Sequence, residues 1–269
     1  MTFGTDLTLA LELADVADAM TMARFRATDL RVDTKPDLTP VTEVDHAVED
    51  ELRRRLAVAR PGQAVLGEET PDLGCRSGAA QRWIVDPIDG TKNYVRGVPV
   101  WATLIALERD GRMVVGVVAA PALGRRWWAA RGEGAWAGSG TTSDDWQPIR
   151  VSTVSEVEDA FISYDGLERF DPDTVDADAD GRLVRLAHRC WRSRGLGDFW
   201  SHVLVAEGAV DIAAEPVVSV WDVAPIQVIV EEAGGRFTDL TGEARSDGGS
   251  ALSTNGILHE EVLAALGKV

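Results

Sequence analysis

The segment W-I-V-D-P-I-D-G-T-K-N, residues 83–93, places two carboxylates, a proline and a glycine directly after three apolar residues. The apolar run predicts a buried β-strand. The proline fixes its own φ and has no N–H, and the glycine permits a backbone conformation closed to most other residues. We therefore expect a rigid turn after the strand, in which the side chains of Asp86 and Asp89 and the carbonyl of Ile88 converge on one point.

Such a turn would form a cage made of oxygen atoms alone. Hard cations such as Mg²⁺ prefer carboxylate, carbonyl and water oxygens, whereas zinc sites usually recruit histidine or cysteine. The four histidines have no H-x-x-x-H spacing, so we expect surface or packing roles for all of them: His46, His188, His202 and His259. The simpler alternative is that the two carboxylates only end a strand and face solvent.

The composition excludes several other classes of protein. The 269-residue chain carries 27 Lys and Arg against 44 Asp and Glu, a net charge of −17 that disfavours nucleic-acid binding. No apolar run approaches the ~18 residues of a membrane span, and the start M-T-F-G-T-D-L lacks the basic and apolar regions of a signal peptide. Cys75 and Cys190 lie far apart and outside any C-x-x-C spacing. We therefore expect a cytoplasmic protein with free thiols that binds neither nucleic acid nor membrane.

The first part of the chain combines helices with hairpins. Leucine and alanine at helical spacing predict a helix over residues 6–26, and T-E-V-D, a variant of the capping box, begins a second helix over residues 42–56. Strands follow, and we expect them to be joined as hairpins across residues 110–111 and 132–134.

A polar segment at residues 139–147 sets the predicted boundary between two halves, and residues 165–181 form a second, acidic loop. The N-terminal α+β half spans residues 1–145 and carries most of the acidic motifs, and the C-terminal half spans residues 146–269. In the C-terminal half, predicted strands (160–163, 192–194, 210–214, 236–239) alternate with predicted helices (183–190, 199–207, 223–233). This alternation is α/β in character.

Two further acidic positions fall where predicted elements begin or end. G-E-E at residues 67–69 follows a short apolar strand, and Asp222 in S-V-W-D-V-A-P begins an apolar helix. On its own, an acid at a helix N-terminus is explained by capping. Together with Asp86 and Asp89, however, these carboxylates would repel one another by about 1 kcal/mol or more per pair unless cations neutralise them. We therefore expect metal binding.

Taken in order, G-E-E, D-P-I-D-G-T, W-D-V-A and E-A-G-G resemble motifs of the inositol monophosphatase family of Mg²⁺-dependent, lithium-sensitive phosphomonoesterases. The resemblance covers nearly the whole chain, from K-P-D-L-T-P at Lys35 to E-A-G-G ending at Gly235, and D-P-I-D-G-T is highly specific. It implies an α+β fold, the layered αβαβα sandwich of the inositol monophosphatase and fructose-1,6-bisphosphatase type. It also implies a homodimer.

The resemblance assigns metal ligands one position at a time. Asp86 would bridge two Mg²⁺ ions. Glu68 and the carbonyl of Ile88 would complete the coordination of the first ion, and Asp89 and Asp222 would complete that of the second. Glu68 would also reach a third, looser ion.

The resemblance also implies catalytic and supporting roles. Thr91, paired with Glu68, would orient the attacking water, and the metal ligand Asp89 is counted with them among the catalytic residues. Gly90 and Thr91 would donate hydrogen bonds to the phosphate. Outside the ligands, Glu69 would support the metal site and Asp45 would face Lys35 or the third ion; the alternative is a solvated helix.

The metal cage does not distinguish among the family's esters, which include inositol phosphates, sugar bisphosphates, phosphoadenosine phosphate and histidinol phosphate. The leaving alcohol would lie near Asp222, near G-D-F-W at residues 197–200 and near Glu215, which inositol enzymes also match with an acid. Asp198 adds a negative charge where inositol monophosphatases typically have small apolar residues. A second carboxylate matches a cationic amine and an imidazole, whereas a neutral polyol does not need it.

Further stretches, R-G-V-P-V-W-A-T-L-I-A-L and R-R-W-W-A-A-R-G-E-G-A among them, are similar to the histidinol-phosphate phosphatases of actinobacterial type within this family. We therefore expect a Mg²⁺-dependent phosphomonoesterase that hydrolyses L-histidinol phosphate, a step of histidine biosynthesis, through attack by an activated water. One alternative is an inositol-1-monophosphatase or sugar-phosphate phosphatase on the same scaffold. The other is a non-catalytic regulatory protein that keeps the fold.

Overall fold

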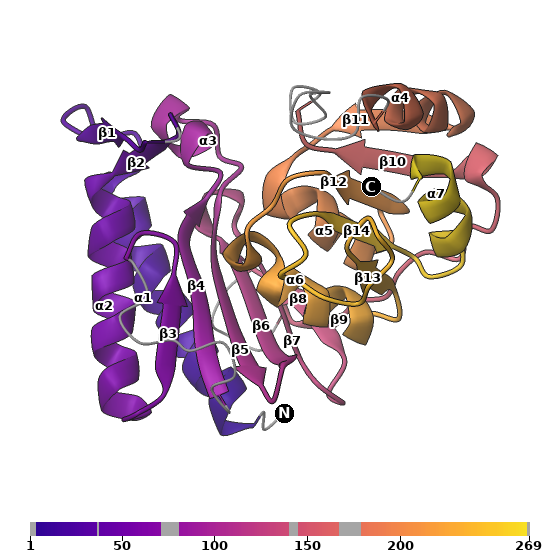
Figure 1. The fold of residues 1–269 in the computed structure, drawn as a ribbon. Coiled ribbons are helices and arrows are strands. Elements are labelled where there is room, and N and C mark those ends of the chain that lie inside the picture. The colour runs from indigo at the N-terminus through magenta and orange to yellow at the C-terminus, as the bar shows by residue number, and fades with distance from the viewer. Residues whose placement is uncertain (1–3, 37, 71–80, 140–144, 167–178, 268–269) are drawn as a thin grey trace.

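The computed structural model describes residues 4–36, 38–70, 81–139, 145–166 and 179–267, and the structural statements below concern these residues. Cys75 and most of the predicted acidic loop at residues 165–181 lie outside them. Within the described ranges, two large sheets and three pairs of helices stack in layers (Figure 1).

A seven-stranded sheet forms the centre of the N-terminal half, in the order β3-β4-β5-β6-β7-β8-β9. Its strands are β3 (Ala64–Gly67), β4 (Gln81–Asp89), β5 (Ala102–Arg109), β6 (Arg112–Ala120), β7 (Arg125–Ala130), β8 (Ala135–Gly138) and β9 (Gln147–Pro148). β3 pairs parallel with β4, and every other pair of neighbours is antiparallel. The predicted hairpins across residues 110–111 and 132–134 are confirmed as β5–β6 and β7–β8.

Helices α1 (Thr5–Arg24) and α2 (Glu43–Ala59) cover one face of this sheet. They confirm the two helices predicted near the N-terminus. Side chains alternate along β4 because successive residues of a strand point to opposite faces. Trp83 and Val85 pack against α1 and α2, whereas Ile84 faces the opposite core. The capping box expected at the start of α2 is present, between Thr42 and Asp45.

The opposite face of the sheet is covered by α5 (Asp198–Ala206) and α6 (Val220–Glu232). α6 lies so close to β6 that a Cβ at Gly116 would be 2.4 Å from the carbonyl oxygen of Pro225. α6 begins earlier than predicted, because Ser219 is its N-cap and Asp222, the third residue of the helix, completes the capping box. The predicted start of this helix at residue 223 was therefore wrong by three residues.

The second sheet has five strands, in the order β11-β10-β12-β14-β13. They are β10 (Phe161–Tyr164), β11 (Arg192–Gly195), β12 (Ile212–Glu215), β13 (Arg236–Thr238) and β14 (Ala251–Thr254). β10 runs parallel to β11 and β12, whereas β14 is antiparallel to β12 and β13, so the sheet is mixed.

Helices α4 (Ala179–Arg189) and α7 (His259–Leu266) pack on the outer face of the five-stranded sheet. The layers are thus α1 and α2, the seven-stranded sheet, α5 and α6, the five-stranded sheet, and α4 and α7 (Figure 1). This order confirms the αβαβα sandwich. The sequence analysis did not predict β14 or α7.

The acidic segment of β4 differs from the turn that the sequence predicted. β4 continues through Asp89, and its pairing with β5 shifts register between Asp86 and Asp89, as at a β-bulge. Gly90 then takes a left-handed conformation, φ 80°, and caps the short helix α3 (Thr91–Arg96). A small hairpin of β1 (Val32–Thr34) and β2 (Pro40–Thr42) lies above the end of β4 (Figure 1).

Candidate active site

A cavity of about 650 Å³ opens between the two halves of the molecule. The N-terminal half contributes the end of β4, the start of α3 and Lys35. The C-terminal half contributes the end of β12 and the first turns of α5 and α6. All the predicted metal ligands line this cavity, namely Glu68, Asp86, Ile88, Asp89 and Asp222.

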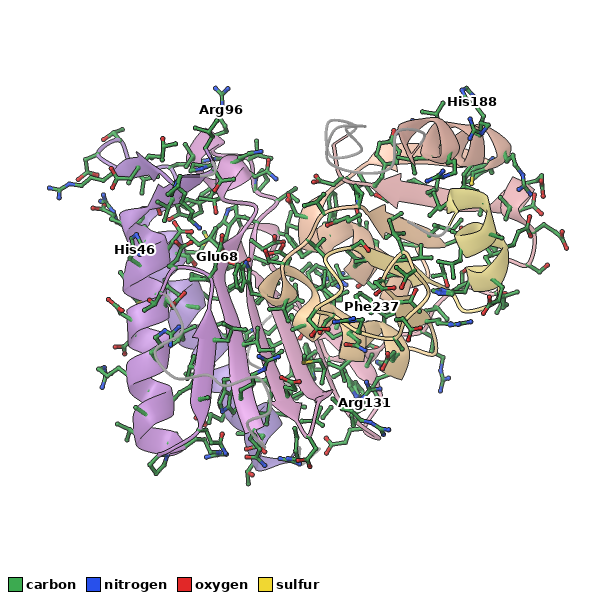
Figure 2. The ribbon with its side chains drawn as sticks, in the orientation of Figure 1. His46, Glu68, Arg96, Arg131, His188 and Phe237 are labelled. Atoms are coloured by element: carbon green, nitrogen blue, oxygen red, sulfur yellow. The ribbon has the colours of Figure 1, made fainter. Side chains whose placement is uncertain are left out.

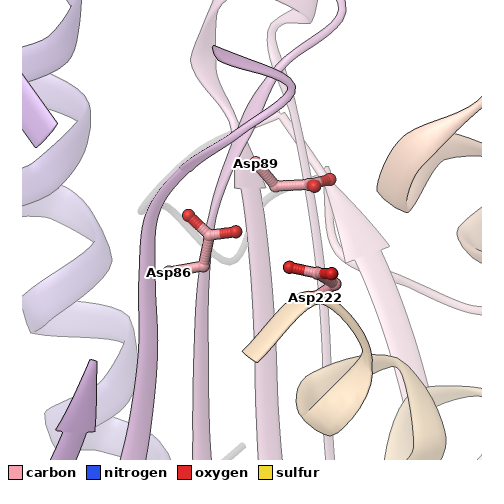
Figure 3. A group of neighbouring side chains, drawn as sticks. All are labelled: Asp86, Asp89 and Asp222. Carbon is pink, nitrogen blue, oxygen red and sulfur yellow. The ribbon is translucent and has the colours of Figure 1, made fainter. Parts of the chain in front are cut away.

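Three of these carboxylates form one cluster. Asp86, Asp89 and Asp222 each place an oxygen within 4.8 Å of the others, although they come from opposite halves of the chain (Figure 3). Asp86 is 1% exposed and Asp89 is 9% exposed. The simpler alternative of solvent-exposed carboxylates at a strand end is therefore wrong.

Local hydrogen bonds hold each carboxylate of the cluster. Asp86 Oδ1 accepts the N–H of Ile88 at 2.9 Å, which the bulge in β4 turns back towards it. Asp89 Oδ2 accepts the N–H of Phe199 at 2.8 Å, so the cluster is tied to the first turn of α5. Asp222 Oδ2 accepts the N–H of Ser219 at 2.7 Å in the capping box of α6.

The cluster is unfavourable for three negative charges. Burial raises the pKa of Asp86 well above its ordinary value, and the nearby carboxylate of Glu68 raises it further. Burial also raises the pKa of Asp89, and the charges of Asp198 and Asp222 add to the effect. A bound cation would remove this repulsion, so these residues fit a metal site better than a purely structural one.

Glu68 lies at the edge of the cluster and is paired with a lysine. Lys35 Nζ is 2.7 Å from Glu68 Oε1 and 2.7 Å from Glu69 Oε1. Burial raises the pKa of Glu69 to about 7, although the hydrogen bond from Lys35 acts in the opposite direction. The ammonium group of Lys35 thus neutralises part of the charge of the G-E-E segment.

The G-E-E segment is held by Glu49 of α2, which the sequence analysis did not single out. Glu49 is fully buried, and its carboxylate accepts the N–H groups of Glu69 at 2.8 Å and Thr70 at 3.0 Å. Arg53 donates to the same carboxylate at 2.8 Å and to the carbonyl of Val65 at 2.8 Å. This buried ion pair therefore fixes the backbone that carries Glu68.

Thr91 sits between the cluster and α2. Its hydroxyl donates to the carbonyl of Ile88 at 2.9 Å and lies 3.5 Å from Asp45 Oδ1. Glu68, which the resemblance pairs with Thr91, forms an ion pair with Lys35. Asp45 is buried, and its carboxylate is held by the backbone N–H and the hydroxyl of Thr42. Asp45 is therefore not solvated, and in the described residues the ion pairs of Lys35 are made with Glu68 and Glu69.

Two more carboxylates lie in the C-terminal wall of the cavity. Asp198, at the start of α5, has a left-handed backbone with φ 49° and accepts a hydrogen bond from Asn93 at 3.2 Å. Its carboxylate also lies close to Gly90, where an added Cβ would be 3.3 Å away. Glu215 ends β12, and its Oε1 is 3.3 Å from His202 Nε2.

The histidines separate into two groups. His46 on α2 and His188 on α4 are exposed on opposite sides of the molecule (Figure 2), and neither lines the cavity. His259 is a packing residue, as expected, hydrogen-bonded to Thr238 and Thr254. His202, by contrast, lines the cavity, and sequence reasoning missed it. Its position four residues after Asp198, on the same face of a predicted helix, was the available signal.

Comparison with known proteins gives a consistent result. The profile of the Inositol monophosphatase family matches residues 5–269. The chain is 56% identical over 263 residues to a histidinol-phosphatase of Mycobacterium tuberculosis, with 97% of each chain covered. It is 50% identical over 268 residues to a histidinol-phosphatase of Streptomyces coelicolor, covering 97% of this chain and 96% of the relative.

Solved structures show the same relationship at the level of the fold. A Thermotoga maritima IMPase superimposes with a TM-score of 0.84 at 28% identity, over 98% of this chain and 97% of that one. Among the described residues, none of the helices has the length and apolar character needed to cross a bilayer. The full-length profile match, the matching fold and the acidic cluster agree, and the chain belongs to the inositol monophosphatase family.

Proposed function

We propose that this protein is a phosphomonoesterase that hydrolyses L-histidinol phosphate to L-histidinol and phosphate. The observation that carries the proposal is full-length identity of 56% and 50% to two proteins named histidinol-phosphatase. Identity to the Thermotoga maritima IMPase is only 28%, although the fold is the same. The similarity is therefore greater than a shared scaffold requires.

The donor set supports Mg²⁺ as the cofactor. Asp86, Asp89 and Asp222 supply three convergent carboxylates, and we add Glu68 and the carbonyl of Ile88 as further ligands. Oxygen ligands without histidine or cysteine fit a hard divalent cation. When bound, Mg²⁺ would screen the phosphate dianion, lower the pKa of a water and stabilise the leaving oxygen.

Residues of the N-terminal half would position the phosphate and the water. The hydroxyl of Thr91 donates a hydrogen bond to the carbonyl of Ile88, so its oxygen keeps lone pairs that can accept a hydrogen bond from a water. We assign to Thr91 and Glu68 the orientation of that water for attack on phosphorus, in line with the breaking P–O bond. The N–H groups of Gly90 and Thr91 begin a helix and would donate to the phosphate oxygens.

Residues of the C-terminal half would recognise the leaving alcohol. Histidinol carries an ammonium group and an imidazole, and both Asp198 and Glu215 line the cavity. Two carboxylates on this side favour a cationic alcohol over a neutral polyol. We therefore assign to Asp198 and Glu215 the selection of substrate, with Asp222 at the border between metal and alcohol.

The decisive experiment measures purified protein with Mg²⁺ on histidinol phosphate, inositol phosphates and fructose bisphosphate. We expect the highest kcat/KM for histidinol phosphate, and a higher value for a neutral sugar ester would overturn the assignment. Glu215→Gln removes the charge but keeps the shape. It should reduce kcat/KM for histidinol phosphate more than for p-nitrophenyl phosphate, which has no cation to recognise; equal losses would exclude Glu215 from recognition of the alcohol.

An inositol or sugar phosphatase is the second candidate, favoured by the similarity of fold to the Thermotoga maritima IMPase. The same substrate panel separates the two. From the resemblance to the family we further propose a third Mg²⁺, inhibition by lithium, a homodimer and a cytoplasmic location. Lithium titration of the activity tests the second of these, and sedimentation of the purified protein tests the dimer.

A further inference from the structure

His202 is a buried histidine with one ring nitrogen directed at the carboxylate that we assign to substrate recognition. His202 lies on α5, and the exposed fraction of the whole residue is 0%. Nδ1 lies 2.7 Å from the hydroxyl of Ser253 on β14, and Nε2 lies 3.3 Å from Glu215 Oε1. The imidazole therefore connects the five-stranded sheet to the wall of the cavity.

The surroundings of the two polar atoms show what the contact can do. His202 Nε2 and Glu215 Oε1 are both buried, and in the described residues neither makes a hydrogen bond, although they lie 3.3 Å apart. The hydroxyl of Ser253 can donate to Nδ1 or accept from it. When it donates, the ring N–H lies at Nε2, on the side that faces Glu215.

The contact involves one particular carboxylate oxygen. Glu215 is 6% exposed, and Oε1, the oxygen 3.3 Å from His202 Nε2, is buried. Because a buried carboxylate oxygen without a donor is costly, loss of His202 would favour another rotamer of Glu215.

We infer that His202 is a positioning residue for substrate specificity, which orients Glu215 towards the cationic group of the leaving alcohol. The inference rests on the proposed function, because it concerns the same site and the same alcohol. His202 itself needs no contact with substrate. The chain of contacts Ser253–His202–Glu215 links strands β14 and β12 through α5, so the direction of the carboxylate is fixed by the core of the C-terminal half.

The test compares two esters in two variants. His202→Leu keeps a similar volume but removes the donor, and we expect KM for histidinol phosphate to rise about 10-fold, the value of one hydrogen bond to a charged group. The kcat/KM for p-nitrophenyl phosphate should stay within about 2-fold of the wild type. His202→Gln keeps a donor and should recover part of the loss. An equal loss on both esters in His202→Leu would overturn the inference.

A double-mutant cycle separates positioning from a merely structural role. If His202 acts through Glu215, His202→Leu should cause no further rise in KM in the Glu215→Gln background. Additive effects would contradict the proposal. His259→Leu is the matched control, since His259 is equally buried but lies between two hydroxyl groups, those of Thr238 at 3.1 Å and Thr254 at 3.0 Å. This substitution should lower the free energy of unfolding without changing the ratio of the kcat/KM values for the two esters.

Two further results keep the outcome unambiguous. If His202→Leu does not fold, Ser253→Ala removes the partner of Nδ1 without altering the cavity wall. It should then raise KM for histidinol phosphate, and an unchanged KM would refute the proposed orientation. If the wild type prefers a neutral sugar ester, the proposed function fails, whereas the coupling between His202 and Glu215 is still decided by the cycle on that ester.

Discussion

Gly67, the first residue of the G-E-E motif, has no room for a methyl group. It ends β3 against α2, and an ideal Cβ there would lie 2.3 to 2.4 Å from three atoms of the Glu49 carboxylate. Cβ atoms essentially never approach other heavy atoms closer than 3.0 Å. In Gly67→Ala the carboxylate must therefore retreat by about 0.7 Å or the strand must move away.

The loss of stability in Gly67→Ala follows from the hydrogen bonds that the Glu49 carboxylate accepts. Its bonds to the N–H groups of Glu69 and Thr70 are 2.8 and 3.0 Å long, so a shift of about 0.7 Å stretches them to about 3.5 and about 3.7 Å. Two hydrogen bonds to a buried charge are worth roughly 3 to 5 kcal/mol, allowing for partial relaxation. We expect Gly67→Ala to lower the free energy of unfolding by this amount, measured by denaturation in urea.

The same shift should disturb the metal site, because the moved backbone carries Glu68. We expect the Mg²⁺ concentration for half-maximal activity to rise about 10-fold, as for other residues that support metal ligands. Gly4→Ala is the control, since its Cβ would meet only Glu133 at an ordinary 3.6 Å. In the Glu49→Ala background the clash is absent, so Gly67→Ala should cost little there. A full additional loss in that background would refute the steric argument.

Three other predictions concern the acidic cluster and a buried histidine. Asp89→Asn removes one clustered carboxylate, so kcat/KM should fall about 100-fold or more and the melting temperature should respond less to Mg²⁺; wild-type turnover would contradict the metal role. Burial and neighbouring charges raise the pKa of Asp86 and of Asp89, so protons compete with the cation. Stabilisation by Mg²⁺ in calorimetry should therefore keep growing as the pH rises above the usual titration range of aspartate, and a constant shift would argue against this competition. Burial lowers the pKa of His259 to about 4 from 6.5, so its stabilising effect is complete above pH 6.5 and is lost as the pH falls towards 4. His259→Gln should therefore flatten the dependence of unfolding free energy on pH in that range, and an unchanged slope would assign it to other groups.

The convergence of Asp86 and Asp89 could be predicted because the chemistry is local. A proline and a glycine within six residues restrict the backbone, whichever way the rest of the chain folds. The type of backbone was not predictable in the same way. The segment is a bulge in a longer strand because pairing with β5 resumes at Asp89, and that pairing depends on residues distant in sequence.

The supporting residues were harder to find because they depend on tertiary contacts. In the sequence, Glu49 looks like any other glutamate of a surface helix, such as Glu51, which pairs with Arg54 and Arg55 further along α2. A signal existed, since Glu49 is four residues after Asp45 and three before Leu52, on the buried face. The capping box at Ser219 and Asp222 was likewise readable from its spacing of three.

The short elements were missed for a different reason. β14 has only four residues, A-L-S-T, and its pairing with β12 and β13 is what makes it a strand. Such a run contains too little periodicity to separate a strand from a loop. The layers of the sandwich could be expected from the resemblance to the family, whereas the mixed order of the five-stranded sheet follows from long-range pairing.

The close approach of α6 to β6 at Gly116 has a consequence for how such a scaffold can diversify. A helix without clearance for one methyl group cannot slide or tilt to suit a new ligand, so Asp222 is anchored to the least adjustable layer of the molecule. The start of α5 and the end of β12 instead form a wall that presents the side chains of Asp198 and Glu215 to the cavity. New alcohols can thus be accepted by exchanging side chains in that wall, while the phosphate chemistry stays in place.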